Sequence, residues 1–193
     1  MSDHERMFRH EHAHKLDDPE RQQWLPPADL MARLELAPGL RVADVGAGTG
    51  YFALPIARAV TPGGRVFAVD VQYEMLEHLR AKLDTEPVSL VHGEATRTTL
   101  DDDSVDLVFL ANVWHEVDDL PAALVEIARI LRPAGRLAIL DWRTDVEQPP
   151  GPPLEHRIPE GDVVALLREH GFVARAPEHV GRFSYLVTAR RSS

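Results

Sequence analysis

Arg41-Val-Ala-Asp-Val-Gly-Ala-Gly-Thr-Gly50 is the stretch that decides the fold of this chain. Val42 to Val45 predict a short buried strand, because β-branched residues such as valine favour extended backbone. Glycines follow at positions 46, 48 and 50, and a helical pattern begins at Tyr51. Glycine permits a tight turn and a close approach to a ligand, and the first N–H groups of the following helix are free. Strand, glycine turn and helix in this order are typical of nucleotide sites in open α/β sheets.

The composition is that of an ordinary globular chain of 193 residues, with 44% hydrophobic and 27% charged residues. This length favours one main domain. The net charge of −10 argues against nucleic acid or an anionic membrane as a partner, because both require a basic surface. A small molecule fits the charge better. The chain has no cysteine, which excludes disulfides and thiolate chemistry.

The first residues, 1 to 14, are polar and histidine-rich, with no apolar run that would indicate a secretory signal. No stretch approaches the roughly 20 apolar residues that a membrane span needs. We therefore expect a cytoplasmic protein and leave its oligomeric state open. We expect residues 1–27 to form an N-terminal tail or lid, and residues 28–193 to form a single domain.

Hydrophobic periodicity predicts alternating helices and strands after residue 28. We expect strands at 42–45, 66–69, 88–91, 105–111 and 136–140, and helices at 28–36, 51–60, 75–83, 120–131 and around 163–167. A proline-rich loop spans 142–159, and two final strands, 172–174 and 183–188, are close enough to be antiparallel. The prediction is an α/β fold with five β/α units, in which helices cover both faces of a doubly wound, seven-stranded, mostly parallel sheet that ends in a C-terminal antiparallel hairpin.

Two residues indicate which nucleotide the turn suits. The dinucleotide fingerprint requires glycine at its sixth position, which is Tyr51 here, so an NAD-dependent oxidoreductase is disfavoured. Asp70 ends the second strand, where a carboxylate accepts hydrogen bonds from ribose hydroxyls. Its alternative role is to cap a helix beginning near Tyr73. Together the two residues predict a nucleoside ligand without a pyrophosphate.

Several ordered motifs then resemble one family. Val42-Ala-Asp-Val-Gly-Ala-Gly-Thr-Gly-Tyr-Phe52 resembles motif I of the class I S-adenosylmethionine (SAM)-dependent methyltransferases, and Val66-Phe-Ala-Val-Asp70-Val71 resembles their acidic second motif. Further matches are His92-Gly-Glu-Ala95, Val105-Asp-Leu-Val-Phe-Leu-Ala-Asn112 and Leu131-Arg-Pro-Ala-Gly-Arg-Leu137. The match covers about residues 38–142, is closest to the type-11 methyltransferase domains and implies a Rossmann-like methyltransferase fold.

The edges of the chain resemble a small group of uncharacterised bacterial methyltransferases. These carry segments like His14-Lys-Leu-Asp-Asp-Pro-Glu-Arg21, Asp141-Trp142 and Gly151-Pro152-Pro153. This second resemblance names a group of proteins and not a substrate.

The family resemblance implies a set of cofactor-binding residues. Gly46 and Gly48 would pass close to the methionine part of SAM, and Gly50 would belong to the same cofactor-binding turn. Asp44 would join the network around the amino end, and Asp70 would hold the ribose. Glu94 and Ala95 would meet the adenine with Val71 packed on the base, and Asn112 would offer its backbone carbonyl to the ammonium group. Glu94 departs from the family pattern, in which Asp is commoner.

Methyl transfer requires a base only when the acceptor loses a proton. The candidates follow predicted strands at their carboxyl ends, where the active crevice of such a sheet lies: His115, Glu116, Asp141 and, in the long loop, His156. Other roles stay open, since His115 could cap a helix near Val117 and Asp141 could orient Trp142 or an arginine. Trp114 and Trp142 favour wall packing over substrate stacking.

The histidines at positions 4, 10, 12 and 14 invite a metal interpretation, but no cysteine supports it and a terminal segment holds ligand geometry poorly. We therefore predict no metal site. A better interpretation is that residues 14–21 fold over SAM and exclude water.

The sequence as a whole predicts a cytoplasmic, SAM-dependent methyltransferase that acts on a small molecule and releases S-adenosylhomocysteine. The alternatives are a non-catalytic SAM-binding regulatory protein and, less favoured, an NAD-dependent oxidoreductase.

Overall fold

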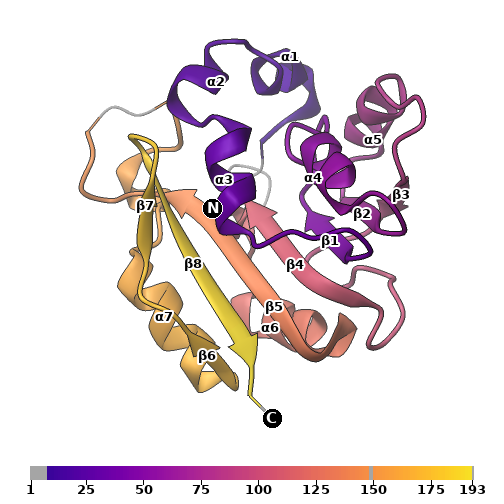
Figure 1. Cartoon of the computed structure of the whole chain (residues 1–193). Coiled ribbons are helices and arrows are strands. Elements are labelled where there is room, and N and C mark those ends of the chain that lie inside the picture. The colour runs from indigo at the N-terminus through magenta and orange to yellow at the C-terminus, as the bar shows by residue number, and fades with distance from the viewer. Residues whose placement is uncertain (1–7, 148–149, 193) are drawn as a thin grey trace.

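A computed structural model describes residues 8–147 and 150–192 of the chain. Its centre is one eight-stranded sheet with the order β3-β2-β1-β4-β5-β8-β6, in which β7 pairs with β8 beside that path (Figure 1). The strands are β1 (Arg41–Val45), β2 (Arg65–Asp70), β3 (Val88–His92), β4 (Val105–Ala111), β5 (Leu131–Trp142), β6 (Phe172–Ala174), β7 (Glu178–Val180) and β8 (Ser184–Arg191).

The first five strands are parallel, and β8 runs antiparallel to β5, β6 and β7. The strand order reverses between β1 and β4, because the chain first builds outward through β2 and β3 and then returns to the other side of β1. In an open α/β sheet the ligand crevice lies at such a reversal, outside the carboxyl ends of the strands. The sheet topology confirms the predicted doubly wound fold with an antiparallel C-terminal part.

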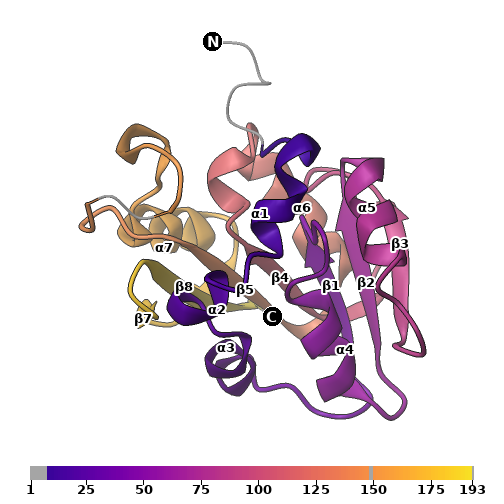
Figure 2. The ribbon, with the colours of Figure 1, turned by 90° about the horizontal axis from the view of Figure 1, so that it is seen from above.

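Helices cover both faces of the sheet (Figure 2). They are α3 (Pro27–Arg33), α4 (Ala53–Val60), α5 (Tyr73–Arg80), α6 (Leu120–Ile130) and α7 (Glu160–Glu169), with short helical segments η1 (His10–His12), α1 (Ala13–Leu16), α2 (Arg21–Trp24), η2 (Trp114–Glu116) and η3 (Leu154–His156). Alternate residues of each central strand enter different cores. Val108 and Ile139 pack with α6 and α7, whereas Phe109 and Leu140 pack with α3 and α4.

Parts of the fold differ from the sequence prediction. The strand β7 was not predicted, because its three residues include the polar pair Glu178 and His179. The strand β5 begins at Leu131 and not at Arg136, and its register against β4 shifts between Val105 and Leu107. No helix forms in residues 93–104, all of which the structure describes, so β3 and β4 are joined by a loop, and this unit lacks the helix that five β/α units would include.

Candidate functional site

A cavity of about 930 Å³ lies at the carboxyl edge of the parallel strands. Four loops build its wall, and each of them follows a strand: 46–49 after β1, 71–72 after β2, 93–96 after β3 and 112–119 after β4. The N-terminal segment and the proline-rich loop cover it from other sides, through residues such as Leu16, Trp24 and Pro152. Its size is that of a pocket for a drug-sized or cofactor-sized molecule.

The glycine turn forms the part of this wall that follows β1. Gly46 and Gly48 have φ angles of +74° and +53°, which favour glycine. A Cβ at Gly46 would lie 2.3 Å from Val113 Cγ2, so the turn has no room for a larger residue there. Gly50 is placed differently, because it does not line the cavity and a Cβ there would lie 2.3 Å from Leu79 Cδ1 of α5.

Asp70 joins the end of β2 to the glycine turn. Its Oδ2 accepts a hydrogen bond of 2.8 Å from Gly48 N–H, and its Oδ1 accepts one of 2.9 Å from Gln72 N–H. Burial raises the pKa of Asp70, and these N–H groups oppose that rise. The carboxylate lines the cavity and retains lone pairs beyond the two backbone contacts. Its predicted alternative role as a helix cap is wrong, because Gln72 is the N-cap residue of α5 and no side chain caps that helix; Asp70 instead accepts from the Gln72 N–H just before it.

Asp44 is a buried carboxylate that faces the same cavity without a hydrogen bond to any described residue; only 2% of it is exposed. Burial raises its pKa to about 7, the negative charge of Asp70 adds to the rise, and Arg21 opposes it. A buried carboxylate is costly unless it is paired. An ammonium group in the cavity would supply the missing partner, so the site fits a ligand such as SAM, which carries one.

The remaining predicted cofactor residues line the cavity as well: Val71, Glu94, Ala95 and Asn112. Val71 is 37% exposed, which leaves an apolar surface on which a base can pack. Glu94 and Ala95 lie in a tight turn closed by a bridge between Glu94 and Arg97. Asn112 adopts a φ of +57°, and its N–H donates to Leu140 O at 2.8 Å.

His115 lines the cavity and forms a buried pair with Asp141, which is not among the residues that line the cavity. The ring Nδ1 of His115 lies 2.8 Å from Asp141 Oδ1, and the His115 backbone N–H donates to Asp141 Oδ2 at 2.9 Å. Because an ionised carboxylate can only accept a hydrogen bond, Nδ1 carries the hydrogen in this contact, and Nε2 is the acceptor nitrogen of a neutral ring. Burial lowers the pKa of His115, but the hydrogen bond and charge of Asp141 outweigh it, and the pKa lies above its ordinary value.

Glu116 is the third predicted candidate, and its Oε1 lies 3.7 Å from His115 Nε2. Burial raises the pKa of Glu116 to about 7, against the positive charge that His115 carries when protonated. His156 in η3 and Trp142 also line the cavity, whereas Trp114 is fully buried and does not. Trp142 packs on Trp24 with 5.5 Å between the ring centroids, which agrees with the wall role.

The N-terminal segment contributes residues that sequence reasoning did not identify individually. Asp17 accepts hydrogen bonds from Thr49 Oγ1 at 2.7 Å and from Lys82 Nζ at 2.6 Å. The Arg21 guanidinium lies 4.1 Å from the centroid of the Tyr51 ring and lines the cavity. Gln72 is a further residue of this kind, since its side-chain amide donates to Phe8 O and accepts a hydrogen bond from His10 N–H. No local motif marks these contacts, because each joins segments distant in sequence.

No group of three or more histidine, aspartate and glutamate side chains suited to a metal ion forms within residues 8–147 and 150–192. His4 lies outside the described residues. In the same ranges, no helix has the length and apolar character needed to cross a bilayer.

The fold is that of an open α/β protein, and its larger described cavity lies where such proteins bind ligands, at the β1–β4 reversal. Residues 43–139, half of the chain, match the family model described as a methyltransferase domain. The chain belongs to this family, the class I SAM-dependent methyltransferases, for which SAM is the cofactor. This result confirms the predicted enzyme class and cofactor and removes the NAD-dependent alternative.

Individual relatives agree. A SAM-dependent methyltransferase from Aquifex aeolicus is 31% identical and superimposes with a TM-score of 0.90, covering 96% of this chain and 100% of its own. An uncharacterised methyltransferase of Mycobacterium tuberculosis is 47% identical over 131 residues, which are 67% of this chain and 47% of that protein. A demethylmenaquinone methyltransferase of Staphylococcus aureus is 34% identical over 113 residues, 58% of this chain and 47% of its own length. The chain thus spans about half the length of the Mycobacterium tuberculosis and Staphylococcus aureus relatives.

Proposed function

We propose that this chain transfers the methyl group of SAM to a small-molecule acceptor that loses a proton, and that His115 receives that proton. The observation that carries the proposal is the position of His115, which lines the cofactor-sized cavity while its ring Nδ1 is held by the buried Asp141. The acidic net charge of −10 and the name of the Staphylococcus aureus relative, whose substrate is a small molecule, both support this acceptor class.

The cofactor-binding assignments form part of the proposal. The glycine turn carries the methionine part, Asp44 pairs with the ammonium group, and Asp70 accepts the ribose hydroxyls. Glu94, Ala95 and Val71 hold the adenine, and the Asn112 carbonyl supplements Asp44. The unpaired buried Asp44 carboxylate and the lining of the cavity support these roles. Gly50 acts by admitting Leu79 against the turn and not by touching the cofactor.

When bound, SAM supplies an electrophilic methyl group, and its sulfur keeps the electron pair of the broken carbon–sulfur bond. The chain itself contributes position, exclusion of water and a proton acceptor. Asp141 holds the His115 ring and fixes its tautomer, so that Nε2 is free to accept the proton. Glu116, whose pKa is raised to about 7 by burial, stands 3.7 Å away and can carry that proton onward.

We propose further that residues 8–27 act as a lid on the domain formed by residues 28–193. The hydrogen bonds of Asp17 to Thr49 and Lys82, and of Gln72 to Phe8 and His10, support this role. Leu16 also lies against the turn, because a Cβ at Gly48 would approach its Cδ1 to 3.1 Å.

A thermal-shift screen of small acceptors in the presence of S-adenosylhomocysteine tests the function. Acceptors with an ionisable hydroxyl or amine should stabilise the ternary complex, and the same compounds should yield S-adenosylhomocysteine when mixed with SAM. Acceptors that bind without any turnover would instead support the non-catalytic SAM-binding alternative and refute the proposed function.

A further inference from the structure

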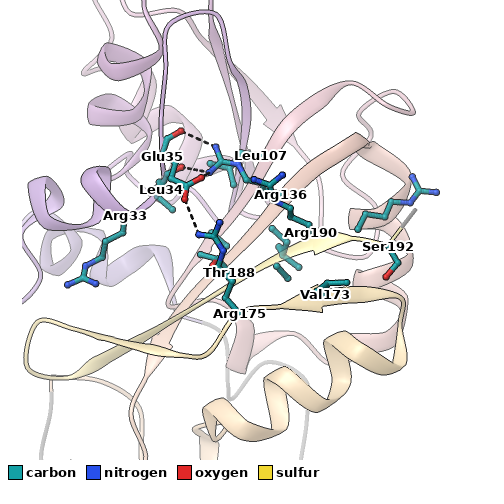
Figure 3. Close-up of a pocket in the computed structure, with 14 residues that line it drawn as sticks. Arg33, Leu34, Glu35, Leu107, Arg136, Val173, Arg175, Thr188, Arg190 and Ser192 are labelled. Atoms are coloured by element: carbon teal, nitrogen blue, oxygen red, sulfur yellow. Dashed lines mark hydrogen bonds and ion pairs between the residues drawn. The ribbon is translucent and has the colours of Figure 1, made fainter.

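A second cavity of about 420 Å³ lies beside residues 136–138 of β5 and 188–191 of β8, and it shares no lining residue with the cofactor cavity. Residues of α3, β5, β6 and β8 enclose it, with Leu107 of β4 at its base (Figure 3). The strand β5 connects the two cavities, since Arg136 lines this one and Trp142, at the end of the strand, lines the other. A ligand here would therefore not touch the proposed catalytic site.

Positive charge is concentrated in this cavity, although the chain as a whole carries −10. Arg136 and Arg190 are directly opposite each other in the antiparallel β5–β8 ladder. Arg175 follows β6 and lines the same hollow. Like charges at directly opposite positions of a ladder repel each other. This arrangement is unfavourable unless an anion lies beside it.

One carboxylate of the chain, that of Glu35, already lies beside two of these arginines. Glu35 accepts hydrogen bonds from Arg175 at 2.9 Å and from Arg136 at 3.0 Å, and Figure 3 shows both arginines directed at it. These contacts lower the pKa of Glu35. A single negative charge faces three positive charges, so the cluster retains a net positive charge of about two.

Arg190 differs from Arg136 and Arg175, because the Glu35 carboxylate acts on it only through electrostatic attraction. Among residues 8–147 and 150–192 its guanidinium has no hydrogen bond and no ion pair, whereas Arg33 on the rim pairs with Glu178 and points away from the cluster. Burial lowers the pKa of Arg136; Glu35 opposes this, and the positive charges of Arg190 and Arg175 lower it further. An additional anion beside Arg190 would relieve this repulsion.

The floor of the cavity is apolar and comes from Leu107, Ala138 and Val173, of which Val173 is 65% exposed. Arginine side chains match the oxygens of phosphate in two-pronged geometry. We propose that this cavity binds a small organic phosphate, with the phosphate on Arg190 and Arg175 and an adjoining apolar group over Val173 and Ala138. The ligand competes with Glu35 for Arg175.

Titration of the full chain with phenyl phosphate, followed by amide and arginine Nε NMR shifts, tests this site. Shifts should map to Arg136, Val173, Thr188 and Arg190, and inorganic phosphate should bind more weakly because it lacks the apolar group. Arg190→Gln should weaken the binding of phenyl phosphate at least fivefold. Glu35→Gln should strengthen that binding at least threefold, because the competing carboxylate is gone. S-adenosylhomocysteine affinity should stay unchanged in both variants.

Arg168→Gln is the matched control, because Arg168 is exposed on α7 and lies outside the cavity. It makes the same change in net charge and should leave the affinity within twofold. An equal loss in Arg168→Gln and Arg190→Gln, shifts that map elsewhere, or weaker binding in Glu35→Gln would overturn the proposal.

Discussion

His115 Nδ1 lies 2.8 Å from Asp141 Oδ1, although the two residues are 26 positions apart; His115 follows β4, and Asp141 lies near the end of β5. The contact exists because β4 and β5 are parallel neighbours, with Ala111 opposite Leu140, so that the carboxyl ends of both strands meet at one edge. This pair sets the behaviour of the proposed base, and the first two predictions test it.

Replacement of His115 by Ala should lower turnover by about 10² to 10⁴, the usual contribution of a general base. Affinity for S-adenosylhomocysteine should change less than threefold, because the assigned cofactor contacts come from other residues. Single-turnover kinetics and calorimetry measure the two quantities. Equal losses in rate and in cofactor affinity would show that His115 acts through packing.

Asp141→Asn should move the acidic limb of the kcat/KM profile to lower pH. Asp141 raises the pKa of His115, so its loss lowers that pKa and leaves the ring unprotonated in more acidic solution. The maximal rate should fall at least tenfold, because an amide does not fix the Nδ1–H tautomer or stabilise the charged ring. A pH–rate profile measures both effects, and a limb that stays in place would contradict the assignment of His115 as base.

Asp70→Ala should weaken the binding of S-adenosylhomocysteine at least tenfold, or by about 1.4 kcal/mol, while the fold survives. The carboxylate lies at the surface of the cavity, and its loss removes the proposed ribose acceptor. Calorimetry gives the affinity and circular dichroism the fold. Asp84→Ala, at an exposed position, is the control. Unchanged affinity in a folded Asp70→Ala protein would remove the ribose assignment.

Cofactor affinity should depend on pH through Asp44, whose pKa is raised to about 7 by burial. A cationic ammonium group favours the ionised carboxylate, so the dissociation constant of S-adenosylhomocysteine should rise about tenfold between roughly pH 8 and pH 6. Asp44→Asn should abolish this pH dependence, and the variant should bind S-adenosylhomocysteine more weakly than the unsubstituted protein.

The same substitution should stabilise the cofactor-free protein above neutral pH. A folded-state pKa above the unfolded value means that the folded chain binds more protons, so the unfolding free energy falls as pH rises from about 4 through 7. Thermal melts of both proteins across this range measure the effect. A pH-independent affinity in the unsubstituted protein would exclude the pairing of Asp44 with the ammonium group.

Lys82→Met should loosen the lid. Lys82 Nζ holds both Asp17 Oδ1 and Thr49 O, at 2.6 and 2.8 Å. Its loss should increase amide hydrogen exchange in residues 9–17 and accelerate release of S-adenosylhomocysteine severalfold. Arg80→Met, which removes the same charge at an exposed position of α5 outside the cavity, is the control. Unaltered exchange and release would leave the segment without a lid role.

The sequence by itself determined the β1 turn, the acidic end of β2 and the alternation of strands and helices, because each depends on neighbouring residues. Periodicity placed β4 at Val105–Ala111 without error, since a strand buried on both faces is a continuous apolar run. It missed β7, whose short polar segment becomes a strand only because β8 offers it a partner.

The tertiary structure decided which distant groups meet. His115, Glu116 and Asp141 were separate candidates in the sequence, and only the β4–β5 register makes two of them a hydrogen-bonded pair. The opposition of Arg136 and Arg190, and the place of Glu35 between Arg136 and Arg175, follow from the antiparallel β5–β8 ladder and the end of α3. Such contacts depend on strand order and register, which local residue patterns do not specify.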